Sequence, residues 1–128
     1  MTNTPSKRIV CIIEDEVPLL RALCDKLSRE GFTTLEAKNG EEGLAVILRE
    51  HPDLILLDLV MPKMDGMTLL KKLREDAWGK SAKVIVLTNL SDMDNMSAAI
   101  IHETYNYLVK SDWRLEDIVV RVREALES

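Results

Sequence analysis

Five polar side chains in this sequence follow short apolar runs or end them. Glu14 and Asp15 follow RIVCII, Asp58 follows LILL, Thr88 ends KVIVLT and Lys110 follows YNYLV. If the fold brings the three acids together, they repel one another. Two carboxylates about 4 Å apart repel by roughly 1 kcal/mol in bulk water and by about 4 kcal/mol at an effective dielectric of 20. Such a cluster therefore needs a cation or a bound proton.

The chemistry of this set points to a hard metal ion and to phosphate. Oxygen ligands without nearby His or Cys favour Mg²⁺, which keeps several of its own waters. A magnesium site beside a carboxylate, a hydroxyl and an ammonium group suits phosphoryl transfer, which depends on positioning and charge neutralisation. A carboxylate can itself accept the phosphoryl group. Whether the five side chains meet depends on the elements that carry them.

Length and composition indicate one globular domain over residues 1–128. The 128 residues are 46% hydrophobic and 30% charged, with a net charge of −5 from 17 basic and 22 acidic side chains. This acidic balance argues against a dedicated nucleic-acid surface, which needs clustered Lys and Arg. We find no signal peptide and no apolar run near the roughly 20 residues of a membrane span. We interpret Cys11 and Cys24 as buried free thiols and expect a cytoplasmic protein.

Strand-like apolar runs alternate with segments of helical spacing along the chain. The expected strands are Arg8–Ile13, Thr33–Ala37, Leu54–Leu57, Lys83–Thr88 and Tyr105–Val109. Apolar residues three and four positions apart indicate a helix after each strand. Pro18 suits the first turn of the first helix, and Gly31 suits its end. Asn39 with Glu42 has the form of a capping box that opens the second helix.

This alternation predicts an α/β fold with parallel strands, right-handed crossovers and helices on both faces of the sheet. The expected architecture is flavodoxin-like and doubly wound, a (βα)5 fold with strand order 2-1-3-4-5. The fourth helix is expected from Ser91 or Asp92 to about His102. In such sheets the ligand site lies beyond the carboxyl ends of the strands, where the strand order reverses. All five polar side chains belong to that edge.

Each of these residues also has a purely structural explanation. An Asp at a strand end often begins a turn, and acids before Pro18 complement a helix dipole. Thr favours strands, and a lysine is usually a solvated surface residue. The prediction of a site depends on the coincidence, because the fold places all five side chains at one edge.

These residues resemble those of a known family, the receiver domain of two-component response regulators. The resemblance covers about Lys7 to Leu126, and four motifs carry it in the family's order: IIEDE, LILLDLVMPKMDG, VIVLT and YLVK. It implies a phosphorylation-activated signalling switch of a two-component or phosphorelay system. It also implies that the protein is not an enzyme and catalyses only its own phosphorylation and dephosphorylation.

The resemblance implies a phosphoacceptor and a magnesium site. Asp58 would take the phosphoryl group as an aspartyl phosphate from the phosphohistidine of a histidine kinase or a histidine phosphotransfer protein. Glu14 and Asp15 would hold Mg²⁺ directly or through water. Asp58 and the backbone carbonyl of Val60 would be the other protein ligands of the metal.

The resemblance also implies how the switch works. Thr88 and Lys110 would bind the phosphoryl oxygens, and Tyr107 would move between exposed and inward positions as Thr88 moves. The surface formed by the fourth helix, fifth strand and fifth helix would then engage a downstream protein. No direct contact with nucleic acid or membrane is expected, and the chain would be a monomer or a weak phosphorylation-dependent dimer.

Two departures from the family pattern bear on the predicted phosphoryl site. Ser111 follows Lys110 where a proline is usual, and Asn89 follows Thr88 where a small residue is usual. A non-proline cis bond costs about 2.5–4 kcal/mol, so we expect a trans or strained bond after Lys110 and a changed reach of the lysine. These departures support the alternative function, a divergent receiver that acts as an unphosphorylated protein-binding adaptor.

Two further functions fit this sequence less well. A magnesium-dependent phosphatase with an Asp nucleophile needs a second acid two residues later, where Val60 stands. A flavin-binding protein needs a hydroxyl-rich phosphate loop after the first strand, where acids stand. Since no linker or effector domain follows Ser128, we expect a stand-alone receiver unless the chain is a fragment of a larger regulator.

Overall fold

The computed structural model describes residues 8–59, 63–88, 106–109 and 114–127, with only the backbone for residues 88 and 106–109. The elements in these ranges are β1 (Ile9–Ile13), α1 (Val17–Arg29), β2 (Thr33–Ala37), α2 (Gly40–Glu50), β3 (Leu54–Asp58), α3 (Gly66–Glu75), η1 (Gly79–Ser81), β4 (Val84–Thr88), β5 (Asn106–Val109) and α6 (Leu115–Glu127). The predicted alternation is confirmed for these residues. The predicted fourth helix lies outside them, and the short 3-10 helix η1 was not predicted.

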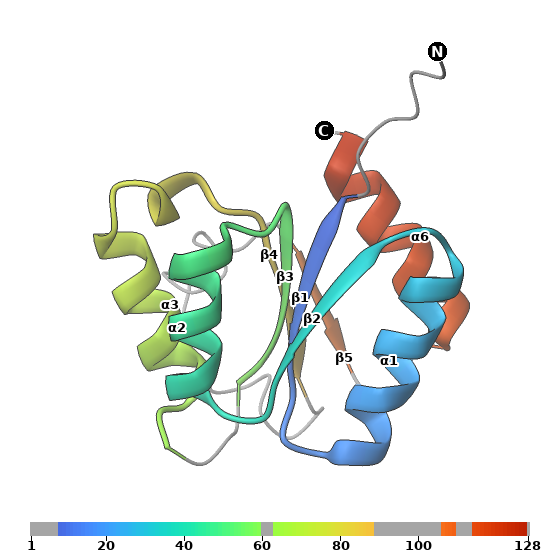
Figure 1. Cartoon of the computed structure of the whole chain (residues 1–128), viewed down its shortest axis with the longest axis horizontal. Helices are drawn as coiled ribbons and strands as arrows, with labels where there is room; N and C mark the ends of the chain where they lie inside the picture. Colours follow the sequence, from blue (N-terminus) through green and yellow to red (C-terminus); the bar gives the residue numbers. More distant parts are fainter. Residues whose placement is uncertain (1–7, 60–62, 89–105, 110–113, 128) are drawn as a thin grey trace.

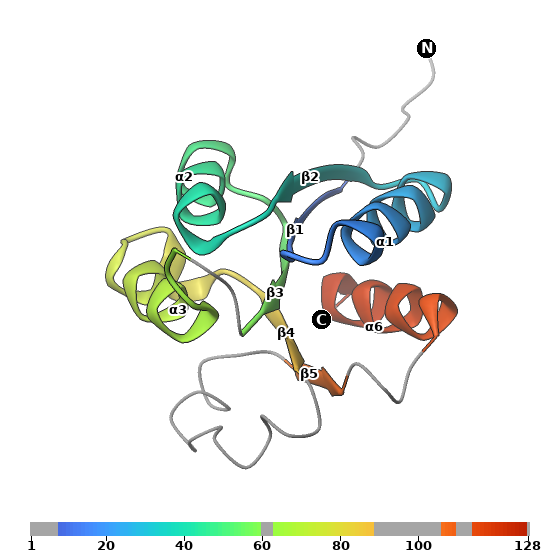
Figure 2. The ribbon, with the colours of Figure 1, turned by 90° about the horizontal axis from the view of Figure 1, so that it is seen from below.

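The five strands form one parallel sheet in the predicted order β2-β1-β3-β4-β5. Figure 1 shows α2 and α3 on one side of this sheet and α1 and α6 on the other. Figure 2, which looks along the strands, shows the same layers with the sheet between them. This is the expected flavodoxin-like α/β architecture, and its site edge is formed by the carboxyl ends of the strands.

Side chains of the central strands alternate between two cores. One core joins α1 and α6 to Val10, Ile12, Leu54, Leu56, Ile85 and Leu87. The other joins α2 and α3 to Cys11, Ile13, Ile55, Leu57, Val84 and Val86. Because both faces are covered, each of these strands is apolar along its length. None of the described helices is long and apolar enough to cross a membrane.

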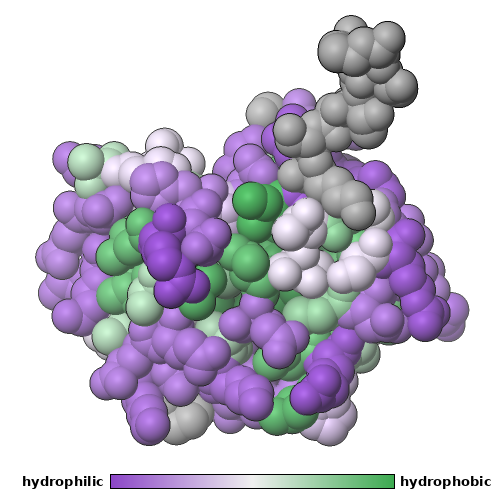
Figure 3. Space-filling model, in the orientation of Figure 1, coloured by the Kyte–Doolittle hydropathy of each residue, from purple (hydrophilic) through white to green (hydrophobic). Residues whose placement is uncertain are grey.

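The outer surface fits this layered packing. On the face drawn in Figure 3, hydrophilic side chains cover most of the outside of the helices, and hydrophobic ones show in the middle, over the edge strand β2. Leu69, Leu70 and Leu73 of α3 are buried, whereas Met67 is 43% exposed. Met67 therefore does not belong to the buried stripe of α3.

Local signals at the helix ends are confirmed where the structure describes them. Gly31 has a φ of 99°, the left-handed conformation that ends α1 after Arg29 and favours glycine. The side chain of Asn39 accepts a hydrogen bond from the backbone N–H of Glu42 at 2.9 Å and caps α2. This bond is the asparagine half of the predicted capping box.

Candidate functional site

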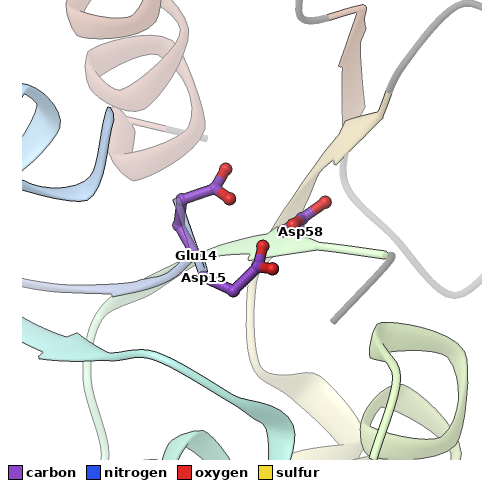
Figure 4. Close-up of side chains that lie close together, drawn as sticks. All are labelled: Glu14, Asp15 and Asp58. Carbon is purple, nitrogen blue, oxygen red and sulfur yellow. The ribbon is translucent and has the colours of Figure 1, made fainter. Parts of the chain in front are cut away.

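Three carboxylates meet at the carboxyl ends of β1 and β3 (Figure 4). Each of Glu14, Asp15 and Asp58 offers an oxygen, and these oxygens all lie within 4.8 Å of one another. Glu14 is fully buried, Asp58 is 3% exposed, and Asp15 is exposed. The predicted meeting of the three acids is therefore observed, with one of them open to solvent.

The position of Asp58 differs slightly from the prediction. It is the last residue of β3 rather than the first residue after it, because β4 extends the pairing and places Leu87 opposite Asp58. The alternation along β3 puts Asp58 on the same face as Leu54 and Leu56, toward α1 and α6. The sheet itself therefore holds the backbone of this residue.

Backbone contacts also hold Glu14 and Asp15 in place. The N–H of Glu14 donates to the carbonyl of Ala37 at 3.0 Å and so continues the pairing of β1 with β2. A carboxylate oxygen of Glu14 accepts a hydrogen bond from the N–H of Glu16 at 3.1 Å. The turn from β1 into α1 is therefore closed by the side chain that belongs to the acid cluster.

The donor set of this acid cluster fits a hard divalent cation. All three side chains offer carboxylate oxygens, which Mg²⁺ prefers, and no soft ligand is among them. Like charges at such separations repel by about 1 to 4 kcal/mol per pair in an environment between bulk water and an effective dielectric of 20. A cation that enters beside the exposed Asp15 would relieve this repulsion, so the residues present fit Mg²⁺.

The other predicted site residues are only partly described. Thr88 ends β4 and pairs with Val109, so its backbone lies at the same edge of the sheet as Asp58. Tyr107 is in β5, opposite Val86. Lys110 and the backbone carbonyl of Val60 lie outside the described residues, as do Asn89 and Ser111. Their roles stay predictions.

One residue beside Asp58 was missed by the sequence analysis. A Cβ at Gly66 would lie 2.5 Å from the carbonyl oxygen of Asp58 and 2.8 Å from the Cα of Leu59. The N–H of Gly66 donates to the carbonyl of Leu59 at 2.9 Å. The available signal was the glycine that ends the motif LILLDLVMPKMDG, since a glycine allows close backbone approach.

Comparison with known proteins yields one family. A family model described as the response regulator receiver domain matches residues 10–123. "Probable transcriptional regulator ycf27" of Porphyridium aerugineum is 34% identical over 120 residues, which are 94% of this chain and 48% of that protein. The transcriptional regulatory protein ResD of Bacillus subtilis is 34% identical over 126 residues, 98% of this chain and 50% of ResD. The chain therefore spans about half the length of these relatives.

Solved structures agree with the family match. A CheY-like response regulator receiver domain protein from Methanospirillum hungatei is 26% identical and superposes with a TM-score of 0.85, covering 95% of both chains. The receiver domain of Francisella response regulator 1452 is also 26% identical, with a TM-score of 0.83 over 94% of this chain and 98% of that one. Both likenesses extend over almost the whole fold.

Proposed function

Because this chain belongs to the response regulator receiver domain family, which its match over residues 10–123 shows, we propose that it is a phosphorylation-activated switch. Receiver domains are signalling switches of two-component systems rather than classical enzymes. In the proposed reaction, the carboxylate of Asp58 accepts a phosphoryl group from a histidine kinase or a histidine phosphotransfer protein. The switch would catalyse no reaction other than its own phosphorylation and dephosphorylation.

One observation carries this proposal: a buried carboxylate at the end of a central strand, gathered with two other acids. Asp58 is 3% exposed, and one of its oxygens lies within 4.8 Å of an oxygen of Glu14 and of an oxygen of Asp15. A structural aspartate that only begins a turn does not need such neighbours, which lower stability. A receiver that binds a cation and a phosphoryl group does need them.

The chemical step forms one bond and breaks one. An oxygen of Asp58 attacks phosphorus as the P–N bond of the donor phosphohistidine breaks, and the imidazole nitrogen keeps the electron pair of that bond. The product is a mixed anhydride on Asp58. Bound at the acid cluster, Mg²⁺ would neutralise charge on the phosphoryl oxygens. The residues that would hold it are Glu14, Asp15, Asp58 and the backbone carbonyl of Val60.

The proposed switch links this modification to a change of surface. Thr88 and Lys110 would bind the oxygens of the new phosphoryl group, and Tyr107 would respond to the movement of Thr88. Such a switch works only if the phosphate makes different contacts in the two states. The output surface would include β5 and α6 together with the predicted fourth helix. A downstream protein would bind there, either to a monomer or to a weak phosphorylation-dependent dimer.

We propose that this phosphoryl transfer takes place in the cytoplasm. Both Cys11 and Cys24 are free thiols, which fits a reducing environment. Burial raises the pKa of each thiol to about 12, so neither is a reactive thiolate near neutral pH. These cysteines are best explained as packing residues: Cys11 is buried in the core that faces α2 and α3, whereas Cys24, predicted to be buried, is only partly buried and packs against the core of α1 and α6.

Phosphorylation of the purified chain tests the proposal directly. Incubation with acetyl phosphate and Mg²⁺ should add one phosphoryl group, detected by intact-mass spectrometry, and beryllofluoride with Mg²⁺ should raise the melting temperature. Asp58→Asn should abolish both responses, whereas Asp53→Asn, a change at the opposite end of β3, should keep both. A folded wild-type chain that shows neither response would contradict the proposal and favour the unphosphorylated adaptor.

A further inference from the structure

Two helices of this fold begin in the same way, with an N-cap Asn or Asp followed by a glycine. Asn39 and Gly40 open α2, and Asp65 and Gly66 open α3. The Asn39 side chain accepts from Glu42 N at 2.9 Å, and the Asp65 side chain accepts from the N–H of the residue three positions later at 2.8 Å. Neither glycine has a positive φ, so the backbone conformation alone does not require glycine at either position.

Gly40 instead allows close contact with the segment that precedes α3. A Cβ at this position would overlap the carbonyl oxygen of Met64 and lie 2.8 Å from its carbonyl carbon. Beside it, the N–H of Glu41 donates to the carbonyl of Lys63 at 3.2 Å. The first turn of α2 therefore touches two consecutive peptide groups, and no side chain larger than hydrogen fits between them at Gly40.

The contacted segment has an unusual backbone. Lys63 has a φ of 53° and Met64 a φ of 91°, and both are non-glycine residues. Positive φ is uncommon for such residues, and each instance costs of order 1–3 kcal/mol and persists only when surrounding structure holds it. The contacts from Gly40 and Glu41 are of the kind that holds such a conformation.

The same segment leads to the backbone of Asp58. Two residues after Met64, Gly66 donates to the carbonyl of Leu59 and packs against the carbonyl of Asp58, where a Cβ would be only 2.5 Å away. Figure 1 shows α2 and α3 neighbouring each other on one face of the sheet. A continuous path of close contacts thus runs from the first turn of α2, through Lys63–Gly66, to the end of β3.

We propose that Gly40 is a positioning residue for the acid cluster. Because Gly40 has no side chain, α2 can pack closely against the segment Lys63–Gly66. This contact fixes the end of β3 and with it the orientation of the Asp58 carboxylate. Gly40 touches neither the cation nor the phosphoryl group, so it acts through Met64 and Gly66. This inference rests on the proposed function of Asp58 as the phosphoacceptor.

The substitution Gly40→Ala tests this role, and Gly79→Ala is its matched control. A Cβ at Gly79 would also overlap a backbone carbonyl oxygen, that of Leu73, but there the contact joins η1 to the last turn of α3. Both variants should lose stability for the same steric reason. Only Gly40→Ala should slow phosphorylation by acetyl phosphate, by about tenfold or more, because an error of about 1 Å in placing a reacting group can cost 10²-fold in rate.

A second readout separates positioning from general loss of stability. For each variant, the free energy of unfolding is measured by urea titration with and without Mg²⁺, and the difference gives the stabilisation due to Mg²⁺. This difference should shrink in Gly40→Ala and keep its wild-type value in Gly79→Ala. Equal rates and equal Mg²⁺ effects in the two variants would overturn the inference.

A pair of changes at Glu41 covers the case in which Gly40→Ala does not fold. Glu41→Pro removes the N–H that reaches Lys63, and proline is tolerated in the first turn of a helix. Glu41→Gln keeps the N–H and removes the charge. Slower phosphorylation in the proline variant alone supports the inference, and equal rates in the two variants contradict it. If the wild type itself takes up no phosphoryl group, the proposed function fails, and the Mg²⁺ effect still decides the positioning role.

Discussion

The two ends of the parallel sheet differ in how their polar and charged groups are arranged. At the amino ends of the strands, donors meet acceptors: the ammonium group of Lys83 donates to the carbonyl of Ala125 at 2.6 Å, and the N–H of Ile9 donates to the carboxylate of Asp53 at 2.7 Å. At the carboxyl ends, like charges gather, since three carboxylates offer oxygens within 4.8 Å of one another. We call the amino ends of the strands the matched end of the sheet, and the carboxyl ends, where the acids gather, the repulsive end.

This difference indicates where the fold gains stability and where like charges would lower it. Arg74 also belongs to the matched end, because its guanidinium donates to the carbonyls of Gly79 and Ala82 at 2.7 and 2.8 Å. Hydrogen bonds from charged groups contribute about 1.5–3 kcal/mol each. Clustered carboxylates instead lower stability until a cation binds. Substitutions at the two ends should therefore change stability in opposite directions.

The largest effect is expected for Asp58→Asn. This change should abolish phosphorylation and raise the free energy of unfolding in Mg²⁺-free buffer by about 1 to 4 kcal/mol, because it removes one of three like charges. It should also reduce the stabilisation that Mg²⁺ provides. Urea titrations with and without Mg²⁺ measure both quantities, with Glu75→Gln on the exposed surface of α3 as the control for charge alone. If the substitution changes neither the free energy of unfolding without Mg²⁺ nor the stabilisation by Mg²⁺, repulsion among the three carboxylates does not affect stability.

A loss of similar size is expected at the matched end for Arg74→Ala. Removing two short hydrogen bonds from one guanidinium should lower the free energy of unfolding by about 3 kcal/mol. The effect of Mg²⁺ and the phosphorylation rate should stay at wild-type values, because Arg74 contacts the region of η1 rather than the acids. The control is Lys72→Ala, an exposed position of the same helix. A change in the Mg²⁺ effect would mean that the two ends are coupled.

A smaller loss is expected for Lys83→Met. Methionine keeps the apolar stem of the side chain but cannot donate to Ala125, so one charge-assisted hydrogen bond is lost, worth about 1.5–3 kcal/mol. Thermal unfolding of this variant is compared with that of Lys80→Met, which changes an exposed lysine nearby. Equal melting temperatures for the two variants would show that the bond between β4 and α6 contributes nothing.

The smallest effect is expected at Glu30, which pairs with Arg123 at 3.1 Å. The hydrogen bond from Arg123, with the charge of Lys26, holds the pKa of the Glu30 carboxyl below its usual value of 4.5. A lowered folded-state pKa means that this stabilisation is present above pH 4.5 and is lost as the pH falls through the folded-state pKa. The wild type should therefore lose its advantage over Glu30→Gln on acidification. Parallel pH profiles of stability for the two proteins would contradict this.

Local signals were enough to predict most of the fold. Apolar runs located all five strands, and their alternation with helical segments gave the strand order that is observed. The meeting of Glu14, Asp15 and Asp58 followed from that order, because the carboxyl ends of parallel strands lie at one edge. Each step used residue types and spacing within a short window, together with a general rule of α/β sheets.

The features that were missed depend on contacts between distant segments. Asp58 was placed just after its strand, because a charged residue at the end of an apolar run suggests a boundary, whereas its pairing with Leu87 is non-local. Likewise, nothing around Gly40 in the sequence indicates Met64 as its neighbour. Met67 is apolar but exposed, and helical spacing alone does not separate it from the buried residues of α3.

The place of β3 in the middle of the sheet has a mechanical consequence. Its backbone is bonded to β1 on one side and to β4 on the other, and both of its faces are packed. A strand held on four sides is stiff, so a load applied to its last residue cannot be absorbed by letting the strand slide or bend. In the proposed switch, strain from a group attached to Asp58 would therefore pass to less rigid neighbouring segments, which would convert a small chemical change into displacement at a distance.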